Sequence, residues 1–216
     1  MANDWYRKIT WTKGDEEEFF LKLSKARNFS KPQYLRIQAY TLYKTNNHKY
    51  FYVAISLLEK CINEYPDEYL QIIESYSLLG DIYYELRKYD IAFENYNNAI
   101  ISEKENRIIS PSAYIGYSLL VLQLNKIELF EKVELLLLNL IEKYTALMGF
   151  PNYRYKINAI LSVLYSYKNE MEKANYYKTL AEEAANSETS DFRYHKKLGI
   201  VKNRNKLLDK LMKKIK

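Results

Sequence analysis

Apolar residues recur at intervals of three and four along most of the chain, which is the period of an amphipathic helix. The stretch 76–100 shows this pattern twice, on either side of a short polar break at 87–90. The positions that share one helical face are Tyr76, Leu79, Gly80 and Tyr83 before the break and Ala92, Tyr96 and Ala99 after it. The spacing therefore predicts two helices joined by a tight turn.

This helix pair resembles the tetratricopeptide repeat (TPR), a 34-residue helix–turn–helix unit with the pattern W-x2-L-G-x2-Y…A-x3-F…A…P. Tyr76 stands at the tryptophan position and Tyr96 at the phenylalanine position, the other five positions match, and Lys104 replaces the terminal proline. Weaker copies lie on both sides, and the corresponding first positions, about 40 residues apart, are Leu35, Ile73, Tyr114 and Tyr155. The resemblance implies repeats near 35–68, 73–106, 114–147 and 155–188.

The prolines divide the chain in the same way. Each falls just before an expected first helix, where the missing N–H of proline does no harm: Pro32, Pro66, Pro111 and Pro151. A further helix is expected upstream, because Thr12 followed by the acidic run 15–18 is a typical helix start. Its apolar face contains Phe19, Phe20, Leu23 and Ala26.

Together with the resemblance, these features predict an all-α fold, a right-handed α-solenoid of about four TPR-like hairpins with capping helices at both ends. The expected segments are an N-terminal cap at 1–34, the repeat array at 35–191 and a basic C-terminal helix at 192–216. Both ends of the chain also look similar to uncharacterised bacterial TPR-containing proteins, a likeness that implies no known activity.

Gly80 lies inside an expected helix, where glycine costs about 1 kcal/mol relative to alanine. In the TPR pattern this position is where the second helix of the unit crosses the first. We therefore interpret Gly80 as a packing residue that faces Ala92, and not as part of a ligand site.

The composition limits the folds and the sites that the chain can form. With 5 glycines and 4 prolines in 216 residues, the chain has few turns. Its one cysteine, Cys61, excludes an intramolecular disulfide and a Cys-rich zinc site. The first eleven residues lack the apolar core of a secretory signal and no apolar run could span a membrane, so a cytoplasmic location is expected.

Candidate chemistry is sparse. His195 has Asp191 four residues earlier and Arg193 nearby, but a lone histidine in a basic segment is more often structural. His48 lies in a polar loop, and Cys61 fits a buried, inert thiol. No phosphate-binding glycine loop, zinc-protease helix, nucleophile elbow or calcium loop is found. The sequence therefore predicts a protein that is not an enzyme and uses no cofactor or metal.

The TPR register predicts a concave groove lined by the first helices, which would hold a peptide or protein partner. Its expected exposed residues are Arg36, Tyr43, Glu74, Ser77, Asp81, Tyr84, Ile115, Ser118 and Leu122. The Lys/Asn/Arg clamp by which some TPR proteins bind chaperone tails is not matched, since Asp81 stands in its place.

Positive charge is concentrated in the C-terminal tail. From residue 192 onward ten basic residues accompany one acidic residue, whereas the preceding residues carry a net charge of −3. Residues 202–216 predict an amphipathic helix, with Leu207, Leu208, Leu211, Met212 and Ile215 on its apolar face. Such a helix could cap the last repeat, contact nucleic acid or an anionic membrane, or join two copies of the chain. Two alternatives to a groove-binding module are thus a nucleic-acid-associated regulator and an inhibitor or immunity-type protein that acts by occlusion.

Overall fold

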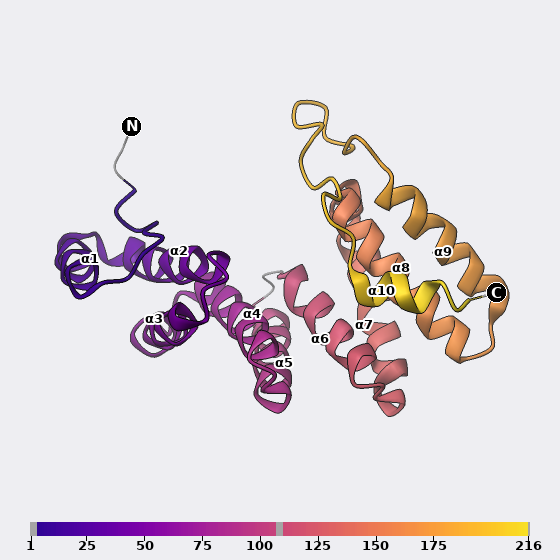
Figure 1. Cartoon of the computed structure of the whole chain (residues 1–216), viewed down its shortest axis with the longest axis horizontal. Coiled ribbons are helices and arrows are strands. Elements are labelled where there is room, and N and C mark those ends of the chain that lie inside the picture. Colours follow the sequence, from indigo (N-terminus) through magenta and orange to yellow (C-terminus); the bar gives the residue numbers. More distant parts are fainter. Residues whose placement is uncertain (1–3, 107–109, 216) are drawn as a thin grey trace. The chain divides into compact units, whose positions relative to one another are not determined.

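The computed structural model describes residues 4–106 and 110–215, so residues 1–3 of the expected N-terminal cap and residue 216 of the tail lie outside the described residues. Within those ranges the chain forms ten α-helices and no strand, which confirms the all-α prediction (Figure 1). The helices are α1 (Lys13–Lys25), α2 (Lys31–Lys44), α3 (Phe51–Glu64), α4 (Tyr69–Glu85), α5 (Tyr89–Asn106), α6 (Pro111–Gln123), α7 (Phe130–Lys143), α8 (Pro151–Tyr167), α9 (Met171–Ala185) and α10 (Lys206–Met212). Short 3-10 turns are η1 (Asn28–Ser30), η2 (His48–Tyr50), η3 (Ile127–Leu129) and η4 (Thr145–Gly149).

The chain divides into two compact units. Unit 1 ends at Tyr117 and unit 2 begins at Ser118, so the boundary falls inside α6. Unit 1 contains α1 to α5 and the start of α6, and unit 2 contains the rest of α6 and α7 to α10. Each unit is a body with its own packed helices, and each is described by itself below.

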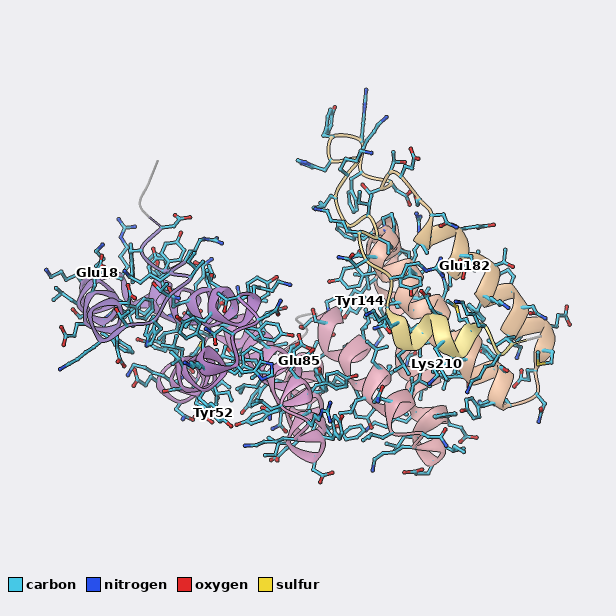
Figure 2. The ribbon with its side chains drawn as sticks, in the orientation of Figure 1. Glu18, Tyr52, Glu85, Tyr144, Glu182 and Lys210 are labelled. Atoms are coloured by element: carbon cyan, nitrogen blue, oxygen red, sulfur yellow. The ribbon has the colours of Figure 1, made fainter. Side chains whose placement is uncertain are left out.

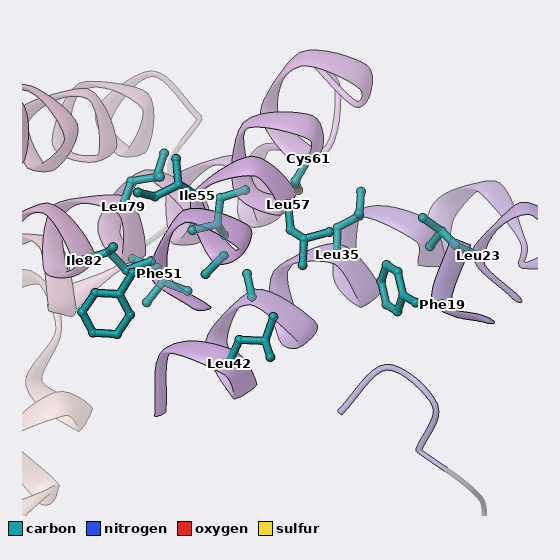
Figure 3. Close-up of a cluster of buried hydrophobic side chains, with 14 residues drawn as sticks. Phe19, Leu23, Leu35, Leu42, Phe51, Ile55, Leu57, Cys61, Leu79 and Ile82 are labelled. Atoms are coloured by element: carbon teal, nitrogen blue, oxygen red, sulfur yellow. The ribbon is translucent and has the colours of Figure 1, made fainter. Parts of the chain in front are cut away.

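Helix α1 begins where the sequence predicts. The Thr12 hydroxyl accepts a hydrogen bond from the Asp15 N–H at 3.2 Å, and the Asp15 carboxylate accepts one from the Thr12 N–H at 2.9 Å. This capping box satisfies two N–H groups at the start of the helix. Phe19 and Leu23 are buried from α1 in the core of unit 1, which Figure 3 shows with Leu35 and Cys61 among its members.

Helices α2 to α9 follow one another as four sequential pairs. Two residues after the first helix of each pair, the backbone turns through a non-glycine residue with positive φ: Asn46 (56°), Arg87 (57°), Asn125 (51°) and Asn169 (60°). Three of these four are asparagine, which tolerates the left-handed region and often ends helices. A 3-10 turn (η2 or η3) precedes the second helix in the first and third pairs, whereas α4–α5 and α8–α9 are joined directly.

Gly80 is a packing residue, as predicted, but its partner differs from the expected one. A Cβ atom at Gly80 would lie 2.5 Å from Cδ1 of Tyr96. The residue of α5 that covers Gly80 is therefore Tyr96 and not Ala92. Gly116 of α6 meets the same ring, since a Cβ there would lie 2.5 Å from Cζ of Tyr96. Two glycines therefore make room for one buried tyrosine.

The basic C-terminal helix is much shorter than the expected 192–216. Residues 186–205 contain no helix, and α10 has seven residues. The chain turns at Gly199, where φ is +72°, and the Asn205 side chain caps α10 by accepting the Leu208 N–H at 3.1 Å. A glycine with positive φ and a helix cap interrupt helical structure, which explains why α10 begins only at Lys206 although the expected helix begins at 192.

Within unit 2, α10 packs against α8 (Figure 1). Leu208, Met212 and Ile215 are buried, and the Lys178 ammonium donates to the carbonyl oxygen of Ile215 at 2.8 Å. Of the predicted roles for the tail, a cap docked on the last helix pair is therefore the one that this packing matches. Three of the five apolar side chains that a membrane or a second copy would need are thus covered by the chain itself, and Leu207 and Leu211 are partly exposed.

Candidate functional site

The structure divides the nine predicted groove residues into two groups. The partly exposed residues are Arg36, Tyr43, Glu74, Asp81 and Tyr84. The buried ones, with their exposed fractions, are Ser77 (2%), Ile115 (4%), Ser118 (0%) and Leu122 (6%). The prediction that these four face an open groove is therefore wrong.

The burial has a physical reason in each helix. Residues 113–122 of α6 are apolar on nearly every side, and a helix of that kind is buried all round, so Ile115 and Leu122 cannot be assigned to a solvent-facing stripe. Small Ser118 lies among them. In α4, Ser77 lies three residues before Gly80 and so shares the face that Tyr96 covers.

The five remaining residues come from two helices of unit 1 that contact each other, α2 and α4. Arg36 and Tyr43 are two turns apart on α2, and Glu74 and Asp81 are two turns apart on α4. At one end the Arg36 Nε–H donates to Gln71 Oε1 of α4 at 2.7 Å. We call the surface formed by Arg36, Tyr43, Glu74, Asp81, Tyr84 and the neighbouring Glu85 the α2–α4 face.

At the other end of this face, Tyr43 lies beside acidic groups. Burial, and then the nearby carboxylates of Asp81 and Glu85, hold the pKa of the Tyr43 hydroxyl well above its ordinary value. Tyr40, one turn earlier on α2, is 48% exposed and lies close enough to add to this effect. The hydroxyl of Tyr43 is therefore neutral at any physiological pH, next to carboxylates.

A buried tyrosine hydroxyl bonds to the carboxylate of Asp81. The buried Tyr96 hydroxyl donates to Asp81 Oδ1 at 2.7 Å. Burial and the Asp81 carboxylate raise the pKa of Tyr96 well above its ordinary value, so the hydroxyl remains a donor. The ring packed into the two glycines thus also fixes the orientation of a carboxylate on the α2–α4 face.

Tyr84 completes the aromatic end of the face. Its ring centroid lies 5.9 Å from that of Tyr89, and burial, followed by Tyr89 and Glu85, raises its pKa. Glu85 is exposed at the last position of α4 (Figure 2). Tyr40 and Glu85 are not among the predicted groove residues, although Glu85 lies one helical turn after Asp81 and extending the register predicts it.

Carboxylates beside tyrosine rings are suited to hold a cation. A lysine or arginine can form charge-assisted hydrogen bonds with the carboxylates while its cationic end lies over a ring. The residues that the structure describes contain no group of three or more His, Cys, Asp and Glu side chains placed to hold a metal ion. The α2–α4 face thus combines carboxylates and aromatic rings on one surface of unit 1.

The other candidates from the sequence lie apart from this face. Cys61 is fully buried, burial raises the pKa of its thiol, and its Sγ lies 3.5 Å from the Pro32 carbonyl oxygen. The His48 ring stacks on Phe51 at 4.7 Å, and His195 is exposed in the segment between α9 and α10. The thiol prediction is confirmed as far as burial is concerned.

The basic tail keeps its charges on the outside of unit 2. Lys206, Lys210 and Lys213 are exposed, and Figure 2 labels Lys210 on α10. Arg204 is engaged with the chain, since its guanidinium donates to both oxygens of Glu182, at 2.7 and 2.8 Å, and to both oxygens of Asp209.

None of the described helices combines the length and the apolar character that a membrane crossing requires. Comparison with protein-family models, with curated proteins and with solved structures finds no match for this chain. The function of the chain therefore has to be inferred from its own geometry, in which the α2–α4 face contains five of the nine predicted groove residues.

Proposed function

We propose that the chain is a non-enzymatic protein-interaction module whose α2–α4 face binds a basic segment of a partner protein. The observation that carries the proposal is the position of Tyr43 beside the carboxylates of Asp81 and Glu85. A partner lysine or arginine would lie over an aromatic ring and pair with Glu85, an interaction that contributes about 0.5–2 kcal/mol per cation–π contact. Arg36, two turns away, would favour an acidic residue further along the same segment.

The finer fold assignment belongs to the same proposal. We infer a right-handed solenoid of four TPR-like hairpins, supported by four sequential helix pairs that share one turn residue conformation. In unit 1, α4 contacts both α2 and α3, as stacked hairpins require. First helices that lie side by side would present Arg36, Tyr43, Asp81 and Tyr84 to one partner segment.

A peptide array tests the proposal. Fluorescently labelled full-length chain is applied to dodecapeptides that carry lysine, arginine, glutamate or glutamine at the central positions, and the best binders are measured by fluorescence anisotropy. Binders should be basic, and Glu85→Lys should weaken them roughly tenfold, since it places like charges together. Tyr43→Ala should have a similar effect, and Tyr52→Ala on α3, which removes a 59% exposed ring elsewhere, should have none. Array binding that favours acidic peptides, or that ignores Glu85→Lys, would refute the proposal.

A second candidate function rests on the exposed charge of unit 2. The exposed basic residues of its C-terminal segment are Arg193, Lys196, Lys197, Lys202, Lys206, Lys210, Lys213 and Lys214. We propose, as this second function, that the chain is a nucleic-acid-associated regulator and that these side chains contact nucleic-acid phosphates. Binding to labelled duplex DNA or RNA should then fall steeply between about 50 and 200 mM salt and weaken on replacing Lys206, Lys210 and Lys213 by Gln. Binding that is absent at low salt, or insensitive to these changes, would exclude it.

A further inference from the structure

Unit 2 contains a cleft of about 570 Å³ between α7, η4, α8 and α9. Its apolar lining includes Leu138, Met148 and Leu180, and Tyr176 and Tyr177 of α9 contribute aromatic rings. The volume lies within the range of about 300–1,000 Å³ that binding sites have. The α2–α4 face belongs to unit 1, so this cleft is a separate site.

A buried amide lines the cleft. Asn158 of α8 is 3% exposed, and no described residue forms a hydrogen bond with its side chain. An asparagine amide has two donor hydrogens and an acceptor oxygen, and buried amides almost always find partners. The amide atoms of Asn158 are not among the enclosed polar atoms that lack a partner, so they keep access to the cleft and can bond to a molecule that enters it.

The first helices of the other three pairs carry different residues at the position that corresponds to Asn158. Asn158 is the eighth residue of α8, as Gln38 is of α2 and Tyr76 of α4, and Tyr117 has the corresponding place in α6. Tyr76 packs against the core of unit 1, and Tyr117 contacts Phe93 with ring centroids 5.4 Å apart. Large rings fill this position in the two central pairs, and an amide occupies it in the first and the last.

In the first pair the amide holds an extended segment of the chain. The Lys8 N–H donates to Gln38 Oε1 at 2.9 Å, and the Gln38 amide nitrogen donates to the Lys8 carbonyl oxygen at 2.7 Å. Gln38 is fully buried, and its amide oxygen and amide nitrogen both bond to the backbone of one residue, Lys8. Aromatic side chains flank this contact, since Tyr6 stacks on Tyr34 at 4.5 Å and Trp11 packs on Phe19 at 5.4 Å.

We infer that the Asn158 cleft binds an extended segment of another protein, whose backbone bonds to the Asn158 amide and whose large apolar or aromatic side chain fills the cleft. The charged side chains at the cleft indicate which charge the partner segment carries. Glu183 of α9 is an exposed carboxylate at the cleft, whereas Arg154 of α8 donates to Asp191 at 2.8 Å. The carboxylate of Glu183 therefore complements a lysine or arginine next to the anchoring side chain, as Arg7 follows Tyr6 in the segment bound at Gln38.

The inference has a test that needs no ligand. Replacing Asn158 by Leu removes an amide that faces the cleft and bonds to no described residue, so the full chain should keep its Tm within about 1 °C. Asn175→Leu, at an exposed position of α9 outside the cleft, is the matched control and should behave in the same way. An Asn158→Leu chain that melts several degrees below the wild type would show that the amide is bonded within the chain, which overturns the inference.

The second test uses a displayed library of random dodecapeptides, panned on the full chain after removal of peptides that bind the Asn158→Leu variant. Enriched peptides should carry an aromatic or large aliphatic residue next to a basic one. They should bind the wild type at least about tenfold more tightly than Asn158→Leu, as measured by isothermal titration calorimetry. Glu183→Lys should weaken the same peptides, and Asn175→Leu should not.

Other outcomes separate this site from the α2–α4 face. Peptides that lose binding to Glu85→Lys but not to Asn158→Leu would support the proposed function and overturn the cleft inference. Peptides that depend on Asn158 alone would support the cleft inference whatever the fate of the α2–α4 face. A library from which no peptide distinguishes wild type from Asn158→Leu would also overturn the inference.

Discussion

The helix pairs α2–α3 and α8–α9 begin alike and are completed differently. Both first helices start with a proline in their first two positions and carry a buried amide as their eighth residue, Gln38 in one and Asn158 in the other. The chain satisfies the first amide with the backbone of Lys8. The second bonds to no side chain or backbone group among the described residues and faces a cleft, although the C-terminal segment is anchored at Tyr155, one helical turn before Asn158.

The difference shows in which helix pair the chain itself bonds the amide of the first helix and in which pair it does not. The Gln38 amide is enclosed and bonded by the chain, whereas the Asn158 amide faces a cleft in which a partner's backbone could bond to it. Each end of the chain is folded back onto a first helix, but only the N-terminal segment reaches the amide. We therefore regard the first pair as closed by the chain itself and the last pair as open to a partner, and the predictions below test that contrast.

The largest effect is expected from removing the C-terminal closure of unit 2. Truncation after Val201 exposes the surface that Leu208, Met212 and Ile215 cover and should destabilise unit 2 by about 5 kcal/mol. Both tryptophans of the chain, Trp5 and Trp11, belong to unit 1. Circular dichroism should therefore show an early transition while tryptophan fluorescence keeps its wild-type melting curve.

The control for the truncation keeps the tail and removes its charge. Replacing Lys206, Lys210 and Lys213 by Gln should change the stability by less than about 0.5 kcal/mol, because all three side chains are exposed. A truncated chain as stable as the full chain would contradict the account of a packed tail.

The next largest effect concerns how the first helix of a pair meets the second. Gly80→Leu should destabilise unit 1 by about 1–3 kcal/mol, because the new side chain meets the Tyr96 ring. In α8 the same place is taken by Ser162, which donates to the Ala174 carbonyl oxygen at 2.8 Å, and Lys178 stands where α5 has Tyr96. Without a ring to accommodate, that crossing does not need a glycine.

Gly14 of α1 supplies a matched control for Gly80. A Cβ atom at Gly14 would meet nothing closer than the Thr12 hydroxyl at 3.9 Å, so Gly14→Ala should be neutral or stabilise the chain by up to about 1 kcal/mol. Thermal melts followed by tryptophan fluorescence compare the two variants. Superimposable melts for Gly80→Leu and wild type would refute the packing role of Gly80.

Much of the fold follows from the sequence, because its signals are local. The four prolines and the spacing of three and four gave the helix pairs, and Thr12 gave the start of α1. Burial on α6 was mispredicted, since periodicity cannot tell which side of a helix that is apolar all round meets solvent. Neither the partner of Gln38, 30 residues away, nor the lack of one for Asn158 is visible in a local pattern. Those contacts depend on where a non-helical segment lies in space.

A smaller effect, confined to the closed pair, is expected for the amides. Gln38→Leu removes both bonds to Lys8 and leaves its peptide groups without partners, so unit 1 should lose about 1–3 kcal/mol. The emission of Trp5 and Trp11 should shift to longer wavelength as the segment detaches. Asn158→Leu should leave the Tm within about 1 °C, because its amide faces the cleft and bonds to no described residue. Two substitutions that destabilise the chain equally would contradict the contrast between a closed and an open pair.

The smallest effect is a dependence on acid in the segment that precedes α1. The Thr12 backbone N–H, then the Thr12 hydroxyl and the Lys8 ammonium, hold the pKa of Asp15 below its ordinary value of 3.8. A lowered folded-state pKa stabilises the fold above the unfolded value, and this stability is lost progressively as pH falls below about 4. The Tm followed by tryptophan fluorescence should therefore begin to fall below about pH 4, and Asp15→Asn should have a lower Tm than the wild type already at neutral pH. A Tm that is the same at pH 6 and pH 3 would contradict this.

Solvent exchange of the side-chain amide protons tests the central claim most directly. In a 15N-labelled full chain, NMR should find the Gln38 amide protons protected, because one donates to Lys8 within a buried contact. The Asn158 amide protons should exchange much faster and become protected only when a peptide selected on the cleft is added. Equal protection of both amides in the free chain would mean that the last helix pair is already closed.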